Sequence, residues 1–183
     1  MVLVPIVAAV VILLWVAMLY NSLVRSRNTC RESWSGIDTE LKRRYDLIPN
    51  LVETVKGYAK HEQEILQALV DARSRALSSN GSPANQARDE NALVKDLNRM
   101  LAVVEDYPDL KADRSFLHLQ EELVDTEDRI QAARRFFNAN VRDLNNKVES
   151  VPTNLLAGMF GFQKEEFFEI DDARVRQAPR VDT

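Results

Sequence analysis

The side chains best suited to acid–base or metal chemistry are few in this chain. It contains two histidines, His61 and His118, and one cysteine, Cys30. Glu62 follows His61 and so begins an HExxH zinc motif, but the position that needs the second histidine is Ile65. One cysteine forms neither an internal disulfide nor a cysteine-based zinc site. We therefore expect no cofactor and no metal site, and we place both histidines on solvated faces.

Carboxylate pairs are the remaining groups that could do chemistry. Glu121-Glu122 and Asp171-Asp172 are adjacent in sequence, as on a solvated helix face or in a polar tail. Carboxylate metal sites in helical bundles use Glu-x-x-His on facing helices, and the sequence contains no such motif. It also has no glycine-rich phosphate loop and no nucleophile elbow. The sequence therefore predicts a protein that is not an enzyme, with no catalytic residues.

The composition predicts a folded helical protein. Hydrophobic residues make up 45% and charged residues 28% of the 183 residues, which is typical of a globular chain. Only five glycines and six prolines occur, too few turn residues for a β-sandwich or barrel. The net charge of -4 disfavours nucleic acid as a partner, because phosphate binding relies on excess Lys and Arg.

An uncharged segment begins the chain. Val2 to Tyr20 is 19 residues long, or about 28 Å as a helix, which matches the core of a bilayer. Trp15 and Tyr20 lie toward its downstream end, where aromatic rings favour the membrane interface. A cleaved signal peptide is the alternative, but it needs a basic start and a small-residue cleavage site. We expect a retained single-pass anchor.

The orientation of this anchor follows from the charges beside it. Arg25, Arg27 and Arg31 come directly after the span. Because basic residues favour the cytoplasmic side, we expect the following domain in the cytoplasm. A periplasmic or other extracytoplasmic location stays open.

The body of the chain shows helical periodicity. Apolar residues recur at steps of three and four from Leu23 to Leu69, on both sides of Pro49. Proline removes a backbone donor and clashes with the carbonyl of Tyr45, so one helix kinks there or two helices meet. The preserved phase favours one kinked helix. The turn residues of 78–83 then predict a break before a helix over 84–105.

A long helix over 108–150 has the sharpest pattern. Five apolar residues follow one another at steps of seven, and we expect them to form a buried seam: Phe116, Leu123, Ile130, Phe137 and Leu144. The companion seam becomes polar along its length, which favours an antiparallel bundle over a two-stranded coiled coil. The predicted class is all-α: an N-terminal transmembrane helix followed by an elongated antiparallel bundle of long, kinked helices. The expected domains are an anchor (1–20), a bundle (21–170) and a disordered tail (171–183).

Polar groups beside this seam have two interpretations. They form a wet bundle face, or they pair and fix the register of the helices, since an unpaired buried charge is strongly unfavourable. The second interpretation suits Glu127 and Arg134 best. Arg43, Arg44 and Asp46 could face them from the first long helix.

The segment LLAGMFGF is dense in apolar groups and follows Pro152. We expect it to be an interaction element that meets a neighbouring subunit or the membrane surface. The alternative is that it folds back and caps its own bundle. The residues concerned are Leu155, Leu156, Met159, Phe160 and Phe162.

Several longer stretches together resemble one family. They are YNSLVRSRN (20–28), WSGIDTELKRRYDLIPNLVETVKGYAKHE (34–62), ARSRA (72–76), FLHLQEELVDTEDRIQAARRFFN (116–138) and the closing GF and FFE. The chain is similar to the LemA family of bacterial membrane proteins. The resemblance implies long antiparallel helices on one anchor, and it brings no settled catalytic mechanism. The motif residues singled out are Arg43, Arg44, Asp46, Pro49, Asn50, Glu127, Arg134 and Asn138.

Two functions fit these features. The first is a non-enzymatic scaffold in the bacterial inner membrane that acts through protein–protein contacts, as a homo-oligomer or with other membrane-associated proteins. The second is a membrane-surface remodelling or lipid-sensing module that uses the apolar LLAGMFGF segment. A metal-binding protein or an enzyme is the weakest alternative. The expected partners are membrane lipid and protein, with no nucleic acid.

Overall fold

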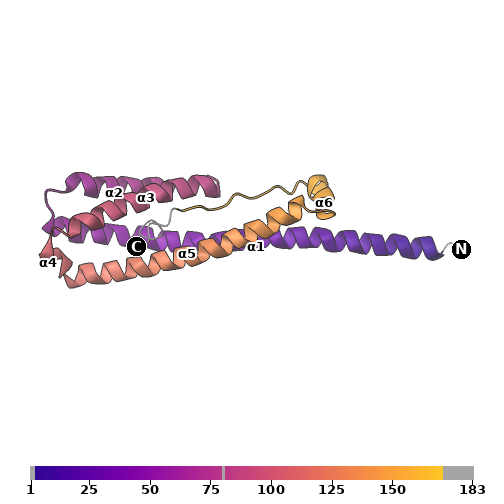
Figure 1. Cartoon of the computed structure of the whole chain (residues 1–183), viewed down its shortest axis with the longest axis horizontal. Coiled ribbons are helices and arrows are strands. Elements are labelled where there is room, and N and C mark those ends of the chain that lie inside the picture. The colour runs from indigo at the N-terminus through magenta and orange to yellow at the C-terminus, as the bar shows by residue number, and fades with distance from the viewer. Residues whose placement is uncertain (1–2, 80, 171–183) are drawn as a thin grey trace, which may run out of the picture. The chain divides into compact units, whose positions relative to one another are not determined.

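A computed structural model describes residues 3–79 and 81–170, and the regular structure in these ranges is entirely helical (Figure 1). This confirms the predicted all-α class. The predicted tail, 171–183, lies outside the described residues. The helices of the described part are α1 (Leu3–Tyr58), α2 (Gln63–Ser78), α3 (Pro83–Val104), α4 (Pro108–Lys111), α5 (Arg114–Glu149) and α6 (Thr153–Phe160).

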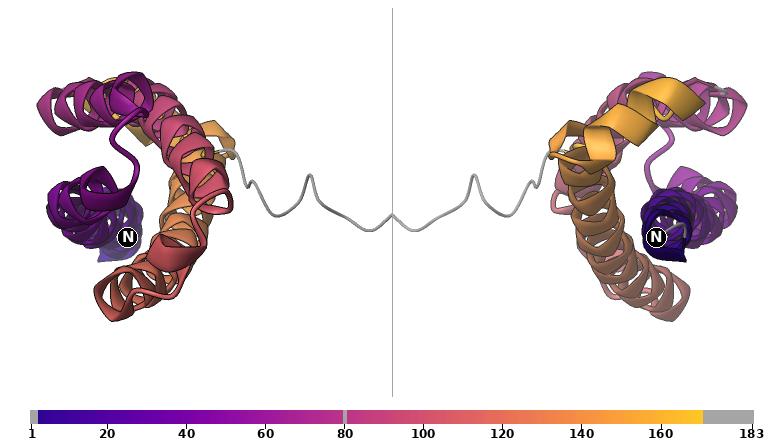
Figure 2. Two further views of the ribbon diagram at one scale, coloured as in Figure 1. Left: turned by 90° about the vertical axis from the view of Figure 1, so that its left-hand side faces the viewer. Right: turned by 90° about the vertical axis from the view of Figure 1, so that its right-hand side faces the viewer.

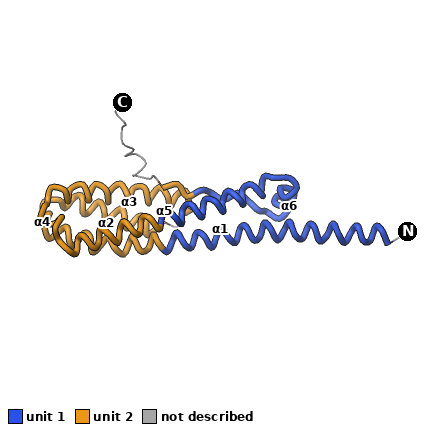
Figure 3. Tube along the Cα trace, turned by 60° about the horizontal axis from the view of Figure 1, so that its bottom comes forward, with its two compact units in different colours: residues 1–39, 130–167 blue, residues 40–129, 168–183 orange. Residues whose placement is uncertain are grey.

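The chain divides into two compact units (Figure 3). Unit 1 consists of residues 1–39 and 130–167, and unit 2 of residues 40–129 and 168–183. Both α1 and α5 therefore contribute residues to each unit. The domain boundaries expected at residues 20 and 170 stay predictions.

The first turns of α1 form an apolar rod. Within the described residues, α1 is the one helix long and apolar enough to cross a membrane, judged by length and composition. Its large side chains from Leu3 to Met18 are mostly exposed to the surroundings of the chain. Such exposure suits a segment surrounded by lipid, because apolar side chains gain nothing from packing inward there.

Helix α1 continues through Pro49, as the preserved apolar phase predicts. It then ends at Tyr58, whereas the same phase continues beyond that point to Leu69. A turn separates α1 from α2, in which the Glu62 N–H donates to the carbonyl of Ala59 at 3.2 Å. The apolar residues of α2, including Leu69, are buried like those of α1, so the spacing of apolar residues does not mark this turn.

Unit 2 is a bundle of the long helical segments from α1, α2, α3 and α5, with the short α4 at one end. Viewed from the α4 end, these segments lie side by side around a common interior (Figure 2, left). The large apolar residues on the buried face of α3 are Leu93, Leu97, Met100 and Val104, while Leu101 is only half-buried. After α6 the chain also contributes Phe168 to a buried position in this unit.

The helix expected over 108–150 is interrupted near its start. The short α4 ends at Lys111, and α5 begins at Arg114. Asp113 precedes α5 and accepts hydrogen bonds from the backbone N–H groups of Ser115 (2.8 Å) and Phe116 (3.0 Å). A carboxylate in this position satisfies donors that the helix itself cannot use, so a new helix starts here.

The seam of residues spaced by seven on α5 is confirmed. All five are at most 4% exposed: Phe116, Leu123, Ile130, Phe137 and Leu144. In unit 1 the second half of α5 packs along α1, where the rings of Trp34 and Phe137 are 5.2 Å apart. Lys147 Nζ also donates to the Ser26 hydroxyl at 2.6 Å. These contacts fix the pairing of the two helices within unit 1.

Candidate functional site

A fully buried arginine lies at the centre of unit 2. Arg44 is 0% exposed and follows the buried stripe of α1, three residues after Leu41 and four before Ile48. Steps of three and four return a helix to the same face. The backbone therefore directs a guanidinium into an otherwise apolar interior. Such a charge is tolerated only if other groups pair with it.

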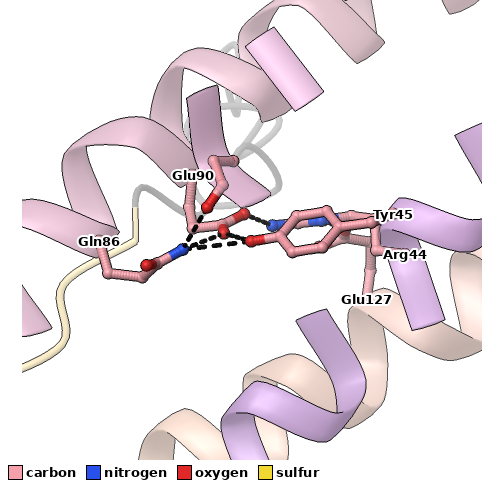
Figure 4. Close-up of polar contacts among 6 residues, drawn as sticks. Arg44, Tyr45, Gln86, Glu90 and Glu127 are labelled. Atoms are coloured by element: carbon pink, nitrogen blue, oxygen red, sulfur yellow. Dashed lines mark hydrogen bonds and ion pairs between the residues drawn. The ribbon is translucent and has the colours of Figure 1, made fainter. Parts of the chain in front are cut away.

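Two carboxylates from different helices pair with this arginine (Figure 4). Arg44 Nη1 donates to Glu127 Oε1 at 2.5 Å, and Arg44 Nη2 donates to Glu90 Oε2. Glu90 on α3 is completely buried, while Glu127 on α5 keeps 24% of its side chain exposed. The ion pairs therefore connect α1 to both α3 and α5 inside unit 2.

Neutral side chains complete the network. The Tyr45 hydroxyl donates to Glu90 Oε1, and the Gln86 amide donates to the same oxygen at 2.7 Å. Gln86 also donates to the Tyr45 hydroxyl oxygen (3.1 Å) and to the carbonyl of Ala76 on α2 (3.2 Å) (Figure 4). The segments of α1, α2, α3 and α5 in unit 2 are thus joined through one set of polar contacts.

The electrostatics of the network keep the arginine charged. Burial alone lowers the pKa of Arg44, but the negative charges of Glu127 and Glu90 outweigh burial and raise it above its ordinary value. The guanidinium is therefore a permanent cation that holds two carboxylates. A side chain in this state positions its partners and exchanges no proton.

A second polar contact supplies the hydrogen-bond donor that α1 lacks at its proline. Pro49 has no N–H, so the carbonyl of Tyr45 lacks its usual donor four residues later. Arg73 of α2 supplies one, because its Nε donates to that carbonyl at 2.6 Å. Arg73 lies in the stretch ARSRA. No structural role was assigned to this stretch in the sequence analysis. The donor that Pro49 removes from α1 is therefore replaced by Arg73 of α2.

Arg44 and Glu90 are both inaccessible to solvent, while Glu127 at the edge of the network stays partly exposed. Two shallow grooves of unit 2 lie outside it. One, of about 700 Å³, is lined by Leu47, Asn50, Glu53, Thr54, Ser115, His118, Leu119 and Glu122. The other, of about 620 Å³, lies between the end of α1 and the start of α2. In the described ranges, His, Cys, Asp and Glu form no group of three or more suited to a metal ion.

The residues singled out in the sequence analysis do not form one site in the structure. Arg44 and Glu127 meet, whereas Arg43 and Asp46 are exposed neighbours on α1. Pro49 is exposed, in the helical turn whose missing donor Arg73 replaces. The remaining three have other positions: Asn50 is exposed at a groove of unit 2, while Arg134 and Asn138 are half-buried in unit 1.

Sequence reasoning missed Glu90, Tyr45 and Gln86. A signal for Glu90 was available, because it precedes Leu93 and Leu97 at helical steps and so lies on the buried face of α3. A carboxylate in such a stripe demands a partner, as does Arg44 in the stripe of α1. The two histidines are exposed, as expected.

The apolar LLAGMFGF segment is divided by the structure. Phe162 is buried, and Leu156 packs against the cluster of Leu23, Ala157 and Phe162 in unit 1. Leu155 and Met159 are instead 69% and 75% exposed. One side of the segment therefore caps its own unit, and the other side is free of such packing.

Comparison with known proteins gives a consistent result. A model of the LemA family matches residues 33–182. The chain is 27% identical over 177 residues to magnetosome protein MamQ 2 of Paramagnetospirillum magneticum, covering 83% of this chain and 65% of that protein. It is 25% identical over 162 residues to protein LemA of Metamycoplasma hominis, covering 88% of this chain and 72% of that protein. It thus spans just under two thirds of the MamQ protein it matches.

Proposed function

Because the chain belongs to the LemA family, we propose that it is a membrane-anchored, non-enzymatic scaffold that self-associates and acts through protein–protein contacts. The anchor is the apolar start of α1. The basic residues after it, Arg25, Arg27 and Arg31, favour a cytoplasmic location for the body on a bacterial inner membrane.

The buried network of unit 2 is the observation that carries this proposal. Its ionic groups bind one another, and Arg44 and Glu90 reach no solvent. Catalysis requires reacting groups that a substrate can approach, and these two side chains are enclosed. Here the buried charges instead fix which faces of α1, α3 and α5 point inward, and therefore which faces are exposed. A fixed exposed surface suits a protein that binds other proteins.

An apolar surface on α5 supports self-association. Leu117 and Val124 are 48% and 45% exposed and are seven residues apart, so they lie on the same side of the helix. Seven-residue spacing of exposed apolar groups is typical of helices that pair side by side. A second copy of the chain would remove both groups from water.

The mass of the detergent-solubilised particle tests self-association. Native mass spectrometry of the wild-type chain should give a multiple of one chain, and L117S/V124S should reduce it toward a single chain. Leu77→Ser is the matched control, because Leu77 is equally exposed but lies on α2. A wild-type particle that contains one chain would contradict the proposed self-association.

The anchor has its own test. Intact mass of the protein purified from membranes should include the apolar span, and the protein should resist extraction by carbonate. A mature chain that begins near Asn21 would show that the segment is removed and that the body is not anchored by it.

A further inference from the structure

Helix α6 packs against the part of α1 where the apolar span ends. Leu23, Ala157 and Phe162 form a small buried cluster in unit 1, and Tyr20 and Leu156 pack against it. The cluster also takes in Val24 and Val148. The chain therefore folds back after α5 to place α6 beside the last turn of the span.

Aromatic contacts define this position closely. The ring of Tyr20 lies 4.8 Å from that of Phe160 and 5.9 Å from that of Phe162, centroid to centroid. The guanidinium of Arg27 lies over the ring of Phe162 at 4.9 Å. Tyr20 is the residue at which the continuous apolar run stops, so α6 would lie near the boundary between acyl chains and headgroups if α1 spans the bilayer.

The direction of α6 also matters. Viewed along α1 from the N-terminal side, α6 runs crosswise to α1 (Figure 2, right). In unit 1 it is the last element alongside α1, which continues beyond it alone toward the N-terminus (Figure 3). If α1 crosses the bilayer, a crosswise helix at this level lies in the plane of the membrane surface.

The outer side of α6 is apolar and unpacked. Leu155 and Met159 are four residues apart on α6 and are each more than two thirds exposed, as is Val151 just before the helix. Phe160 is exposed over half its surface. The helix itself, TNLLAGMF, carries no charge. An uncharged short helix with one packed side and one exposed apolar side is suited to lie at a membrane interface.

We propose that α6 is an interfacial helix whose outer side, Leu155, Met159 and Phe160, inserts into the headgroup region of the same bilayer that α1 spans, together with Val151 just before it. The exposed surface is continuous with the apolar span through Tyr20, which makes lipid its occupant. Arg25 is exposed and lies about 8 Å beyond Tyr20 along α1, at the level where lipid phosphates would lie. The inference rests on the proposed membrane anchoring.

Site-specific fluorescence in vesicles tests the proposal. The full chain carries a single added cysteine, as Leu155→Cys or Met159→Cys, labelled with a polarity-sensitive nitrobenzoxadiazole group. It is reconstituted into phosphatidylcholine and phosphatidylglycerol vesicles with or without spin-labelled lipid. The unsubstituted chain measures any labelling of Cys30, which is buried.

Two further positions serve as controls. Leu14→Cys lies within the span and is exposed. Phe136→Cys is also exposed, but it lies on α5 beside Phe137, which contacts Trp34. Trp34 is about 21 Å beyond Tyr20 along α1, outside the lipid. We expect several-fold stronger quenching by spin-labelled lipid at positions 155 and 159 than at 136, with weaker quenching by aqueous iodide.

Each other outcome overturns a defined part of the reasoning. If position 14 is quenched by spin-labelled lipid while 155 and 159 behave like 136, α6 does not touch lipid and the inference is wrong. If 155 and 159 are shielded from both quenchers, a protein surface covers α6 instead of lipid. If position 14 itself shows no quenching by lipid, the proposed anchoring fails, and the inference fails with it.

Discussion

The contact between Arg73 and the Tyr45 carbonyl leads to a specific thermodynamic prediction. Pro49 removes the helical donor of that carbonyl, and Arg73 Nε replaces it at 2.6 Å. The effect of removing Arg73 should therefore depend on which residue occupies position 49. Four chains test this: the wild type, Arg73→Met, Pro49→Ala, and the double variant.

The expected magnitudes follow from the hydrogen bond. Arg73→Met leaves the carbonyl of buried Tyr45 without its donor and should cost about 1.5–3 kcal/mol, as for hydrogen bonds to charged groups. In the Pro49→Ala background, the new N–H at position 49 can donate to that carbonyl, so the same change should cost less than about 1 kcal/mol. We expect a coupling free energy of about 1–2 kcal/mol between the two positions.

Urea titrations of the full chain in mild detergent, followed by far-ultraviolet circular dichroism, give the four free energies of unfolding. Arg75→Met is the matched control, because Arg75 lies on the same helix and is exposed. It should cost at most about 0.5 kcal/mol in either background. Additive effects of Arg73→Met and Pro49→Ala, within about 0.5 kcal/mol, would refute the donor replacement.

Three further predictions concern the interior and the cap of α5. Arg44→Met should destabilise the chain by about 3–5 kcal/mol in the same titration because it leaves buried Glu90 unpaired, whereas exposed Arg43→Met should change little; equal effects would show that the network is not buried. Ile130→Ala should cost about 2–5 kcal/mol at unchanged m-value because Ile130 is fully buried, and a loss no larger than that of exposed Phe136→Ala would place it on the surface. The backbone N–H of Phe116, then the Tyr58 hydroxyl, lower the pKa of Asp113 below its ordinary 3.8, so the charge stabilises the fold above pH 3.8 and loses this effect as the pH falls through the lowered pKa. The thermal midpoint of Asp113→Asn should accordingly lie below that of the wild type at neutral pH and approach it in acid, while a constant gap would exclude a contribution of the charge.

The predictability of this fold differed between its helices and its turns. The seam from Phe116 to Leu144 was predictable because burial on a helix repeats with a nearly constant step. The turn after Tyr58 was not, since the buried apolar residues of α1 and α2 keep the same spacing across it. The start of α5 was also not predictable, because α4 ends at Lys111 and Asp113 caps α5 without a glycine or proline between the two helices.

The polar site was predictable only in part. The stripe of α1 places Arg44 inward, so a buried cation with some acidic partner follows from the sequence. The identity of the partners does not, because Glu90 and Glu127 are 46 and 83 residues away and many other carboxylates compete. Only the packing of α3 and α5 against α1 selects these two.

Within unit 1, the apolar span and the part of α1 that follows it are one continuous helix. From Leu3 through Thr39 the helix has no break, so the span and the following turns must tilt together. A span that fits a thinner bilayer does so by tilting, typically by about 20°. Over the roughly 28 Å from Tyr20 to Thr39, that tilt carries the far end about 10 Å sideways. If α1 is anchored as proposed, the thickness of the membrane would therefore set the position of the Thr39 end of this part of the helix.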